Sequence, residues 1–428
     1  MKKLFKGNII FSKTSDTLEA LPLHYVAVED GIVSSVTPFI PKEFAGAQII
    51  DCENKLIIPG FCDLHVHAAQ LSNMGLGLDK ELLPWLEDYT FPEEARFSDT
   101  QYADKKYRHF VKLLWQNGTT RSAVFTTIHA ESTIRLMELF SASGLGAYVG
   151  KLNMDRNTVP ALKESTAESL ENTQKWLTHC AKYFQAENEL VKPIITPRFV
   201  PHCTTELQKG LGKLSLKYNV PVQSHLSENR DEIEWVKKLH PESPSYTAVY
   251  DEAGLLGQTP TIMAHCIWNT PEETALLASK NVWIAHCPTS NMNVKSGIAP
   301  IQQYMNQNIK IGLGSDISGG NTLSMPSVIR AALQVSNLYW VYVNQDCPPL
   351  SLFEAFYIAT KGGGSFFGKV GSFETGYEFD ALIIDDTNLS DDNERSLPER
   401  LSRYIYCGDD RQIESRYVRG EYIPEPFS

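Results

Sequence analysis

One segment constrains the fold more than any other: residues 59–67, PGFCDLHVH, in which an apolar run ends in two histidines separated by one residue. Side chains two residues apart on a β-strand leave the same face of that strand. We therefore expect His65 and His67 to present two imidazole nitrogens to one point, which is half of a metal site. Because 11 His in 428 residues would give an H-x-H pattern by chance in about a quarter of such chains, this interpretation depends on the rest of the sequence.

Three later segments have the same arrangement, an apolar, strand-like run with a potential metal ligand at its C-terminal end. They are residues 220–225, 261–265 and 311–316, which end in His225, His265 and Asp316. In a parallel (β/α)₈ barrel the carboxyl ends of all strands meet at one rim, where the active site is built. The order H-x-H, H, H, S-D resembles that of the amidohydrolase superfamily of metal-dependent hydrolases.

Strand-like segments alternate with helix-length segments through the middle of the chain. They lie near residues 60–65, 119–126, 146–153, 194–199, 221–225, 261–265, 283–286 and 311–316. Eight strands separated in this way are typical of an α/β protein with a TIM-like (β/α)₈ barrel. The insert after the first strand, residues 70–97, is too polar and irregular for a simple connection, and we expect it to shape a substrate pocket at the barrel mouth.

Both ends of the chain consist of short strand-like segments joined by turns. Asp30-Gly31 lies between two such segments and is a strong β-hairpin signal. We expect the two ends to assemble one small β-sandwich, as the superfamily resemblance also implies. The predicted domains are residues 1–58 and 371–428 for the two parts of the sandwich and residues 59–370 for the barrel.

Composition and charge narrow the classes of function and location. The net charge of −12 and pI near 5.5 argue against a nucleic-acid ligand, because binding the phosphate backbone requires positive charge. Lys6, Asn8 and Lys13 interrupt the N-terminal segment, so it lacks the apolar core of a signal peptide, and no run approaches the ~18 apolar residues of a membrane span. Eight scattered Cys without a C-x-x-C pattern indicate reduced thiols. We expect a cytoplasmic protein with no membrane association.

Three imidazoles and one carboxylate form the candidate metal site: His65, His67, His225 and Asp316. This ligand set suits Zn²⁺ and also Fe²⁺, and a metal held in this way lowers the pKa of a bound water towards ~7. Binuclear members of the superfamily bridge two metals with a carboxylated Lys at the end of the fourth strand, whereas residues 194–199 read IITPRF. We therefore expect one Zn²⁺ per chain, with Fe²⁺ as the alternative.

Several longer segments resemble the guanine deaminases of this superfamily. These are residues 67–70 (HAAQ), 83–97 (LPWLEDYTFPEEARF), 150–155 (GKLNMD), 196–199 (TPRF) and 224–229 (SHLSEN). The resemblance extends from about residue 55 to about residue 385, and the W-L-x-x-Y-T-F-P pattern is more specific than any metal motif. Two departures are Ser315, where Thr is commoner in the family, and the stretch after Phe199, which reads VPHC instead of a Ser-rich turn.

The resemblance implies hydrolysis of guanine by water to xanthine and ammonia. In the H-x-x-E pattern, Glu228 takes a proton from the attacking water and passes it to a ring nitrogen. His265 donates a hydrogen bond to the attacking oxygen, and Asp316 both binds the metal and carries the second proton to the leaving amine. The implied catalytic residues are therefore Glu228, His265 and Asp316.

The same resemblance implies a substrate pocket that reads the O6 and N1–H edge of guanine. Arg198 can donate to O6 and the Gln70 amide can serve both groups, whereas the amino group of adenine would leave Arg198 unpaired. Phe199 could stack on the purine or shape the pocket with its backbone. The predicted substrate contacts are His67, Gln70, Arg198, Phe199, His225, Glu228, His265 and Asp316. The resemblance also favours a homodimer.

Two other functions stay open. Another mononuclear aminohydrolase of the superfamily, acting on a nucleoside-like thioether, a pterin or a triazine, would not need the pair of Gln70 and Arg198. A non-catalytic barrel that serves as an assembly scaffold would commonly lack ligands, and here the set is complete. The unrelated cytidine-deaminase type of zinc site is excluded, because His129-Ala130-Glu131 has no accompanying P-C-x-x-C motif.

Overall fold

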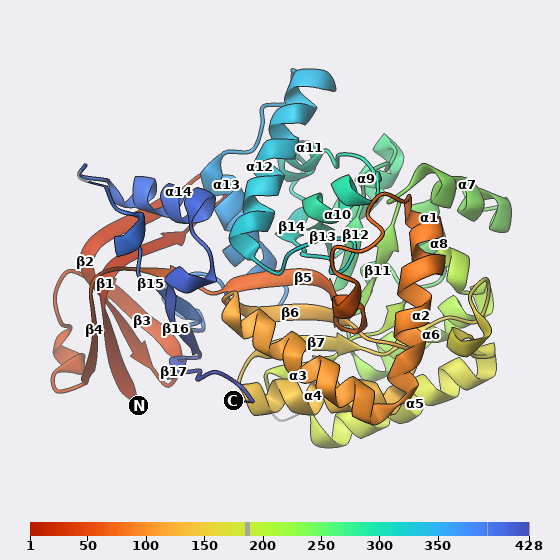
Figure 1. Ribbon diagram of the computed structural model, residues 1–428, viewed down its shortest axis with the longest axis horizontal. Helices are drawn as coiled ribbons and strands as arrows, with labels where there is room; N and C mark the ends of the chain where they lie inside the picture. The colour runs from red at the N-terminus through yellow and green to blue at the C-terminus, as the bar shows by residue number, and fades with distance from the viewer. Residues whose placement is uncertain (185–188, 392, 428) are drawn as a thin grey trace.

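A computed structural model describes residues 1–184, 189–391 and 393–427 of the chain. Figure 1 shows two regions, a β-sheet that contains strands from both ends of the chain and an α/β barrel formed by its middle. No helix among the described residues is both long and apolar enough to span a membrane. All eight Cys are free thiols.

Parallel strands form the barrel in two groups of four, β5-β6-β7-β9 and β11-β12-β13-β14. Their bounds are β5 (Phe61–His67), β6 (Thr119–Phe125), β7 (Gly146–Gly150), β9 (Val191–Pro193), β11 (Val222–Leu226), β12 (Thr261–His265), β13 (Val282–His286) and β14 (Lys310–Leu313). A parallel bridge between Ile195 and Val222 joins the groups on one side. On the other side the Asp316 N–H donates to the His65 carbonyl over 2.8 Å. The predicted parallel α/β architecture is confirmed.

The fourth strand is shorter and more broken than predicted. Residues 194–199 do not form one strand; β9 ends at Pro193, and β10 (Thr196–Pro197) pairs separately with β8 (Leu152–Asn153). The break lies between Ile194 and Ile195: the Ile194 N–H donates to the Val149 carbonyl of β7, whereas the Ile195 N–H donates to the Pro221 carbonyl on the other side. As a result Arg198 and Phe199 lie beyond the strand, at the barrel mouth.

Helices alternate with the strands and cover the outside of the barrel, and capping side chains start several of them. The Asp99 carboxylate accepts from two backbone N–H groups at the start of α3, and Ser165 with Glu168 forms a capping box at α5. The helices are α3 (Thr100–Gln116), α4 (Ala130–Ser143), α5 (Thr166–Tyr183), α6 (Thr205–Tyr218), α7 (Arg230–Leu239), α8 (Tyr246–Glu252), α9 (Pro271–Ala278), α10 (Pro288–Asn293), α11 (Ile301–Asn306), α12 (Met325–Tyr342) and α13 (Leu352–Tyr357).

The insert after β5 is helical. It begins with the 3₁₀ helix η2 (Ala68–Asn73) and continues as α1 (Leu82–Trp85), the π-turn η3 (Leu86–Thr90) and α2 (Phe91–Ala95). The last three elements follow one another without a break and form one column in Figure 1. Apolar side chains of this column pack on Phe125 and Leu152 at the ends of barrel strands. The insert therefore covers part of the barrel mouth.

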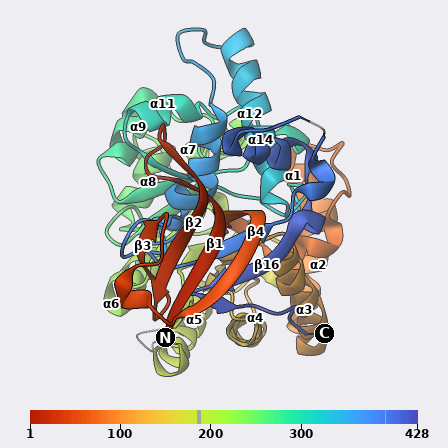
Figure 2. The ribbon, with the colours of Figure 1, turned by 90° about the vertical axis from the view of Figure 1, so that its left-hand side faces the viewer.

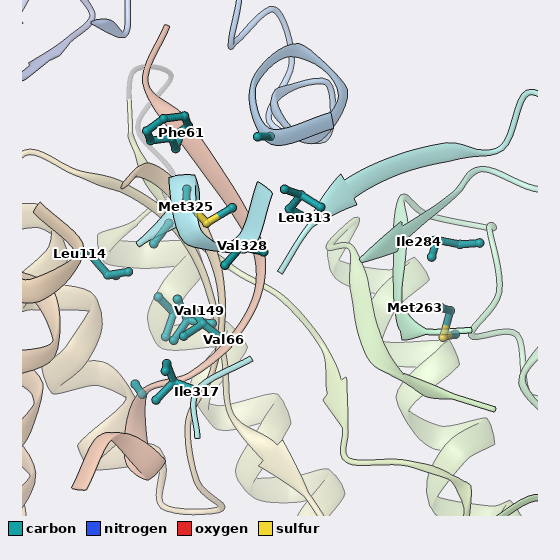
Figure 3. Close-up of a cluster of buried hydrophobic side chains, with 14 of the residues drawn as sticks. Phe61, Val66, Leu114, Val149, Met263, Ile284, Leu313, Ile317, Met325 and Val328 are labelled. Atoms are coloured by element: carbon teal, nitrogen blue, oxygen red, sulfur yellow. The ribbon is translucent and has the colours of Figure 1, made fainter. Parts of the chain in front are cut away.

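Apolar side chains fill both sides of the barrel wall. Successive residues of a strand point to opposite faces. Figure 3 shows members of the outer cluster, which include Val66, Val149 and Leu313 of the strands and Leu114, Met325 and Val328 of the helices; Met263 and Ile284 of the same cluster lie apart from these helix residues. The residues on either side of Met263, Ile262 and Ala264, belong to a separate cluster that faces the interior. The interior is thus a packed core that supports the barrel mouth from below.

Strands from both termini form a single seven-stranded sheet in the order β17-β16-β15-β4-β1-β2-β3, which faces the viewer in Figure 2. Its strands are β1 (Lys2–Ser12), β2 (Leu18–Glu29), β3 (Ile32–Thr37), β4 (Gln48–Pro59), β15 (Ala381–Ile384), β16 (Ile413–Val418) and β17 (Glu421–Tyr422), and α14 (Leu397–Cys407) lies nearby. The predicted hairpin at Asp30-Gly31 joins β2 to β3, with positive φ at both residues. Because the strands belong to one hydrogen-bonded sheet, a two-sheet sandwich is not confirmed, and the domain limits at 58 and 370 stay predictions.

A buried ion pair connects the terminal sheet to the barrel. Arg121 on β6 donates to Asp380 over 2.6 Å and to Glu378 over 2.6 Å, and the Asp380 side chain is almost completely buried. Buried charges are stable only when they are paired. These contacts therefore hold the segment before β15 against the second barrel strand.

Candidate active site

Four potential metal ligands converge at the barrel mouth. The Nε2 atom of His67 lies 3.2 Å from the Nε2 atoms of both His65 and His225. The Oδ1 atom of Asp316 lies 3.1 Å from His65 Nε2 and 3.4 Å from His67 Nε2. Strands β5 and β11 and the segment after β14 thus bring together the four residues that the sequence analysis placed in one site.

The protonation and orientation of the imidazoles suit metal binding. The Nδ1 of His225 lies 2.6 Å from the carbonyl oxygen of Arg198, so an N–H there leaves the Nε2 lone pair free for the cluster. Burial lowers the pKa of His65 and lowers those of His67 and His225 well below their usual value. Neutral imidazoles and a carboxylate are the ligand forms that bind Zn²⁺ or Fe²⁺. The donor set therefore fits one transition-metal ion.

Asp63 connects the backbone of His65 to Ser315, the residue that precedes Asp316. Its Oδ1 accepts from the Ser315 N–H over 3.0 Å and from the His65 N–H over 3.2 Å, and its Oδ2 accepts from the Ser315 hydroxyl. Burial raises the pKa of Asp63 to about 7. The sequence analysis did not assign this residue a role, although an Asp inside an apolar strand is a usable signal, because a buried carboxyl needs partners.

Left-handed backbone turns His265 and Asp316 toward the centre. In β12 the interior residues are Ile262 and Ala264, so simple alternation would point His265 outward. Its φ of 71° breaks that alternation, and Asp316 has a φ of 47°. Positive φ at a non-glycine residue costs about 1–3 kcal/mol. The packing around His265 and Asp316 must offset this cost.

Glu228 and His265 form a pair beside the ligand cluster. The Nε2 of His265 lies 3.3 Å from Glu228 Oε2 and 3.7 Å from Asp316 Oδ2. Burial raises the pKa of Glu228 to about 7. Burial disfavours charge on His265, but the carboxylates of Glu228 and Asp316 outweigh it and raise the His265 pKa above its usual value. The two side chains thus form a close, buried pair of titratable groups beside the ligand cluster.

Two residues that the sequence analysis missed hold this pair. The Asn291 Oδ1 atom lies 2.8 Å from His265 Nδ1, so it accepts the Nδ1–H and leaves Nε2 facing Glu228. The Ser296 hydroxyl donates to Glu228 Oε1 over 3.0 Å. Both residues come from α10 and the loop after it. Nothing in the sequence near them marks a site, because an isolated Asn or Ser is common in loops.

A cavity of about 430 Å³ opens above the cluster. Leu82, Trp85 and Leu86 of the insert line it on one side. The structure places all eight predicted substrate contacts in its wall: His67, Gln70, Arg198, Phe199, His225, Glu228, His265 and Asp316. His65 is fully buried and does not line the cavity. The mixture of apolar walls with a few polar groups is typical of a small-molecule site.

One carboxylate connects the two residues predicted to read the substrate. Glu94, on α2 of the insert, accepts from Gln70 Nε2 over 2.9 Å and from Arg198 Nη1 over 2.6 Å. The Ser318 N–H donates to Gln70 Oε1 over 3.1 Å. The guanidinium of Arg198 also lies over the Phe91 ring, 5.2 Å from its centroid. Glu94 belongs to the segment 83–97 that resembles the guanine deaminases, but nothing in that segment marks it as the partner of Gln70 and Arg198.

A parallel barrel with a His and Asp cluster at the carboxyl ends of its strands defines the amidohydrolase class of hydrolases. Residues 56–423 match the model of the Amidohydrolase family. Guanine deaminase of Dictyostelium discoideum is 40% identical over 98% of both chains, and that of Escherichia coli (strain K12) is 35% identical over 99% of this chain and 98% of its own.

A solved structure of the same kind is closer still. The crystal structure of guanine deaminase from C. acetobutylicum with guanine bound in its active site is 54% identical, with a TM-score of 0.96 over 99% of this chain and 100% of that chain. The chain therefore belongs to the amidohydrolase family and, within it, to the guanine deaminases.

Proposed function

We propose that this protein hydrolyses guanine to xanthine and ammonia. The observation that carries the proposal is one cavity that two sets of polar side chains share. His67, His225, Asp316 and Glu228 lie in its wall, and so do Gln70 and Arg198, which suit the O6 and N1–H edge of guanine. The relatives named above are guanine deaminases, and one of them holds guanine in its active site.

The residues His65, His67, His225 and Asp316 would hold one Zn²⁺ or Fe²⁺. When bound, the metal supplies Lewis-acid activation of the attacking water. The fixed Nδ1 contact of His225 and the backbone links of Asp63 preorganise the site for that ion. Residues 194–199, which follow β9, contain no Lys, so the proposal is for a single ion rather than a pair.

Glu228, His265 and Asp316 move the protons in the proposed reaction. Glu228 Oε2 accepts a proton from the attacking water and delivers it to a ring nitrogen of guanine. His265, held by Asn291, donates from Nε2 to the attacking oxygen. Asp316 Oδ2 takes the remaining proton of that oxygen and passes it to the leaving amine, which departs as ammonia. A Glu pKa of about 7 suits a group that must both gain and lose a proton near neutral pH.

Arg198 and Gln70 give the pocket its preference for guanine. Arg198 uses one N–H for Glu94 and retains others that can donate to O6. Adenine carries an amino donor at that position and would leave the guanidinium unpaired, a mismatch that polar pockets reject strongly. Phe199, 4% exposed in the same wall, offers an apolar surface to the purine ring.

A substrate panel tests the proposed function. Ammonia release should be fast with guanine and slow or absent with adenine, cytosine and S-adenosylhomocysteine. A pterin or triazine as the preferred substrate would favour another mononuclear aminohydrolase, and no turnover of any compound by metal-loaded protein would favour the scaffold. A homodimer and a cytoplasmic location stay predictions; light scattering of the purified protein tests the first.

Metal stoichiometry tests the proposed centre. We expect elemental analysis of active protein to give about one Zn or Fe per chain, because three imidazoles and one carboxylate complete the ligand set of a single ion. Chelation should abolish activity, and one equivalent of metal should restore it. A reproducible ratio of two metals per active chain would contradict the mononuclear site.

A further inference from the structure

Glu94 is a buried charge that does not reach the cavity. It comes from α2 of the insert, has no solvent exposure, and is not part of the cavity wall. Both of its oxygens are engaged, Oε1 by Gln70 and Oε2 by Arg198, and those two partners do line the cavity. A side chain with this placement acts on a ligand only through its partners.

The first effect of Glu94 is on the Gln70 amide. An amide side chain can present either its oxygen or its nitrogen at a given position. Here the Ser318 N–H donates to the oxygen and Glu94 accepts from the nitrogen, so both ends are assigned. One N–H and one lone pair of Gln70 remain for a ligand. The Glu94 carboxylate can only accept hydrogen bonds. It therefore excludes the flipped orientation of the amide, in which the Gln70 oxygen would face Glu94.

The second effect of Glu94 is on charge. Arg198 is only 2% exposed, and an unpaired guanidinium in such a wall would attract anions strongly. The Glu94 carboxylate 2.6 Å away neutralises it, while the planar guanidinium retains donors for a carbonyl oxygen. The wall therefore offers directed N–H groups without a net positive charge.

We propose that Glu94 is a positioning residue that makes this pocket select neutral oxopurines over purine anions, by neutralising Arg198 and holding Gln70 in one orientation. The inference rests on the proposed function and adds a reason for product release. Xanthine gives up a ring proton more readily than guanine does, so a positively charged wall would retain the product as its anion.

The test compares Glu94→Gln with Glu93→Gln. Glu93 is its neighbour on α2, but the Glu93 carboxylate binds Tyr102 and Arg96 instead of the pocket residues. For Glu94→Gln we expect about a tenfold higher KM for guanine and about a tenfold lower inhibition constant for xanthine, with a smaller change in kcat. The decrease in the inhibition constant for xanthine should become larger as the pH rises, because more of the xanthine is then ionised. Glu93→Gln should leave both constants and their pH dependence at wild-type values.

Equilibrium binding separates this inference from the proposed function. Hypoxanthine has the same O6 and N1–H edge but ionises only at higher pH than xanthine, so the ratio of xanthine to hypoxanthine affinity should rise in Glu94→Gln at pH values where only xanthine ionises, whether or not guanine is turned over. A ratio equal to that of wild type at all pH values would overturn the role of Glu94. Failure of wild-type protein to deaminate guanine would overturn the proposed function instead.

Two further variants keep the proposal testable if Glu94→Gln does not fold. Glu94→Asp keeps the charge on a shorter arm, so it should retain weak xanthine binding while raising the KM for guanine. The double variant Glu94→Gln, Arg198→Met removes both charges and should lose the preference for the xanthine anion. A strong anion preference in either variant would show that another group sets the charge of the pocket.

Discussion

We expect Glu228→Gln to bind metal and guanine normally while its kcat falls by about 10²- to 10⁴-fold, the usual worth of a general acid–base group. The amide has the shape of the carboxyl group and can still accept from the Ser296 hydroxyl, which lies 3.0 Å from Oε1. It cannot take a proton from water and return it. Steady-state kinetics, metal analysis and a guanine-binding titration together check the expectation.

The matched control for this variant is Glu234→Gln. Glu234 lies on α7, a few residues further along, and its side chain is exposed. That substitution should change kcat by less than about twofold, as most surface substitutions do. If Glu228→Gln retained a kcat near that of the control, the proton transfer would belong to another group, and His265 would be the first to examine.

Much of the fold follows from local sequence patterns. The barrel strands are short apolar runs between helix-length segments, and the strand positions depend on residues close together in the chain. The ligand cluster follows for a geometric reason, since the carboxyl ends of parallel strands share one rim. The position of His265 does not follow, because strict alternation along β12 would turn it away and only its φ of 71° brings it inward.

The supporting residues depend on contacts between distant parts of the chain. Glu94 and Arg198 are 104 residues apart, and Asp63 and Ser315 are 252 apart. No local periodicity encodes such pairs, and the insert that carries Glu94 has irregular helical structure with a π-turn. The break in the fourth strand also depends on a contact distant in the chain, because the Ile195 N–H leaves β7 and donates to the Pro221 carbonyl.

The second large effect is expected for Arg198→Ala, which should lower kcat/KM for guanine by about ten- to a hundredfold, equivalent to roughly 1.5–3 kcal/mol. The substitution removes a charged donor to the O6 carbonyl. Metal content should not change, because the contact that orients His225 comes from the backbone carbonyl of residue 198, which alanine retains. A second effect must be controlled: the Glu94 carboxylate loses its ion-pair partner, and an unpaired buried charge is destabilising.

The double variant Arg198→Ala, Glu94→Gln provides that control, since it removes the O6 donor without leaving a buried charge. The informative substrate is 2,6-diaminopurine, which keeps the C2 amine but has an amino group in place of O6. Wild-type protein should strongly prefer guanine, because the guanidinium faces a donor in the analogue. In both Arg198 variants, the ratio of kcat/KM for guanine to kcat/KM for 2,6-diaminopurine should be smaller than in wild type. If the ratio of kcat/KM for guanine to kcat/KM for 2,6-diaminopurine stayed at the wild-type value in both variants, Arg198 would not recognise O6. The preference for guanine would then have to come from Gln70 and the shape of the pocket.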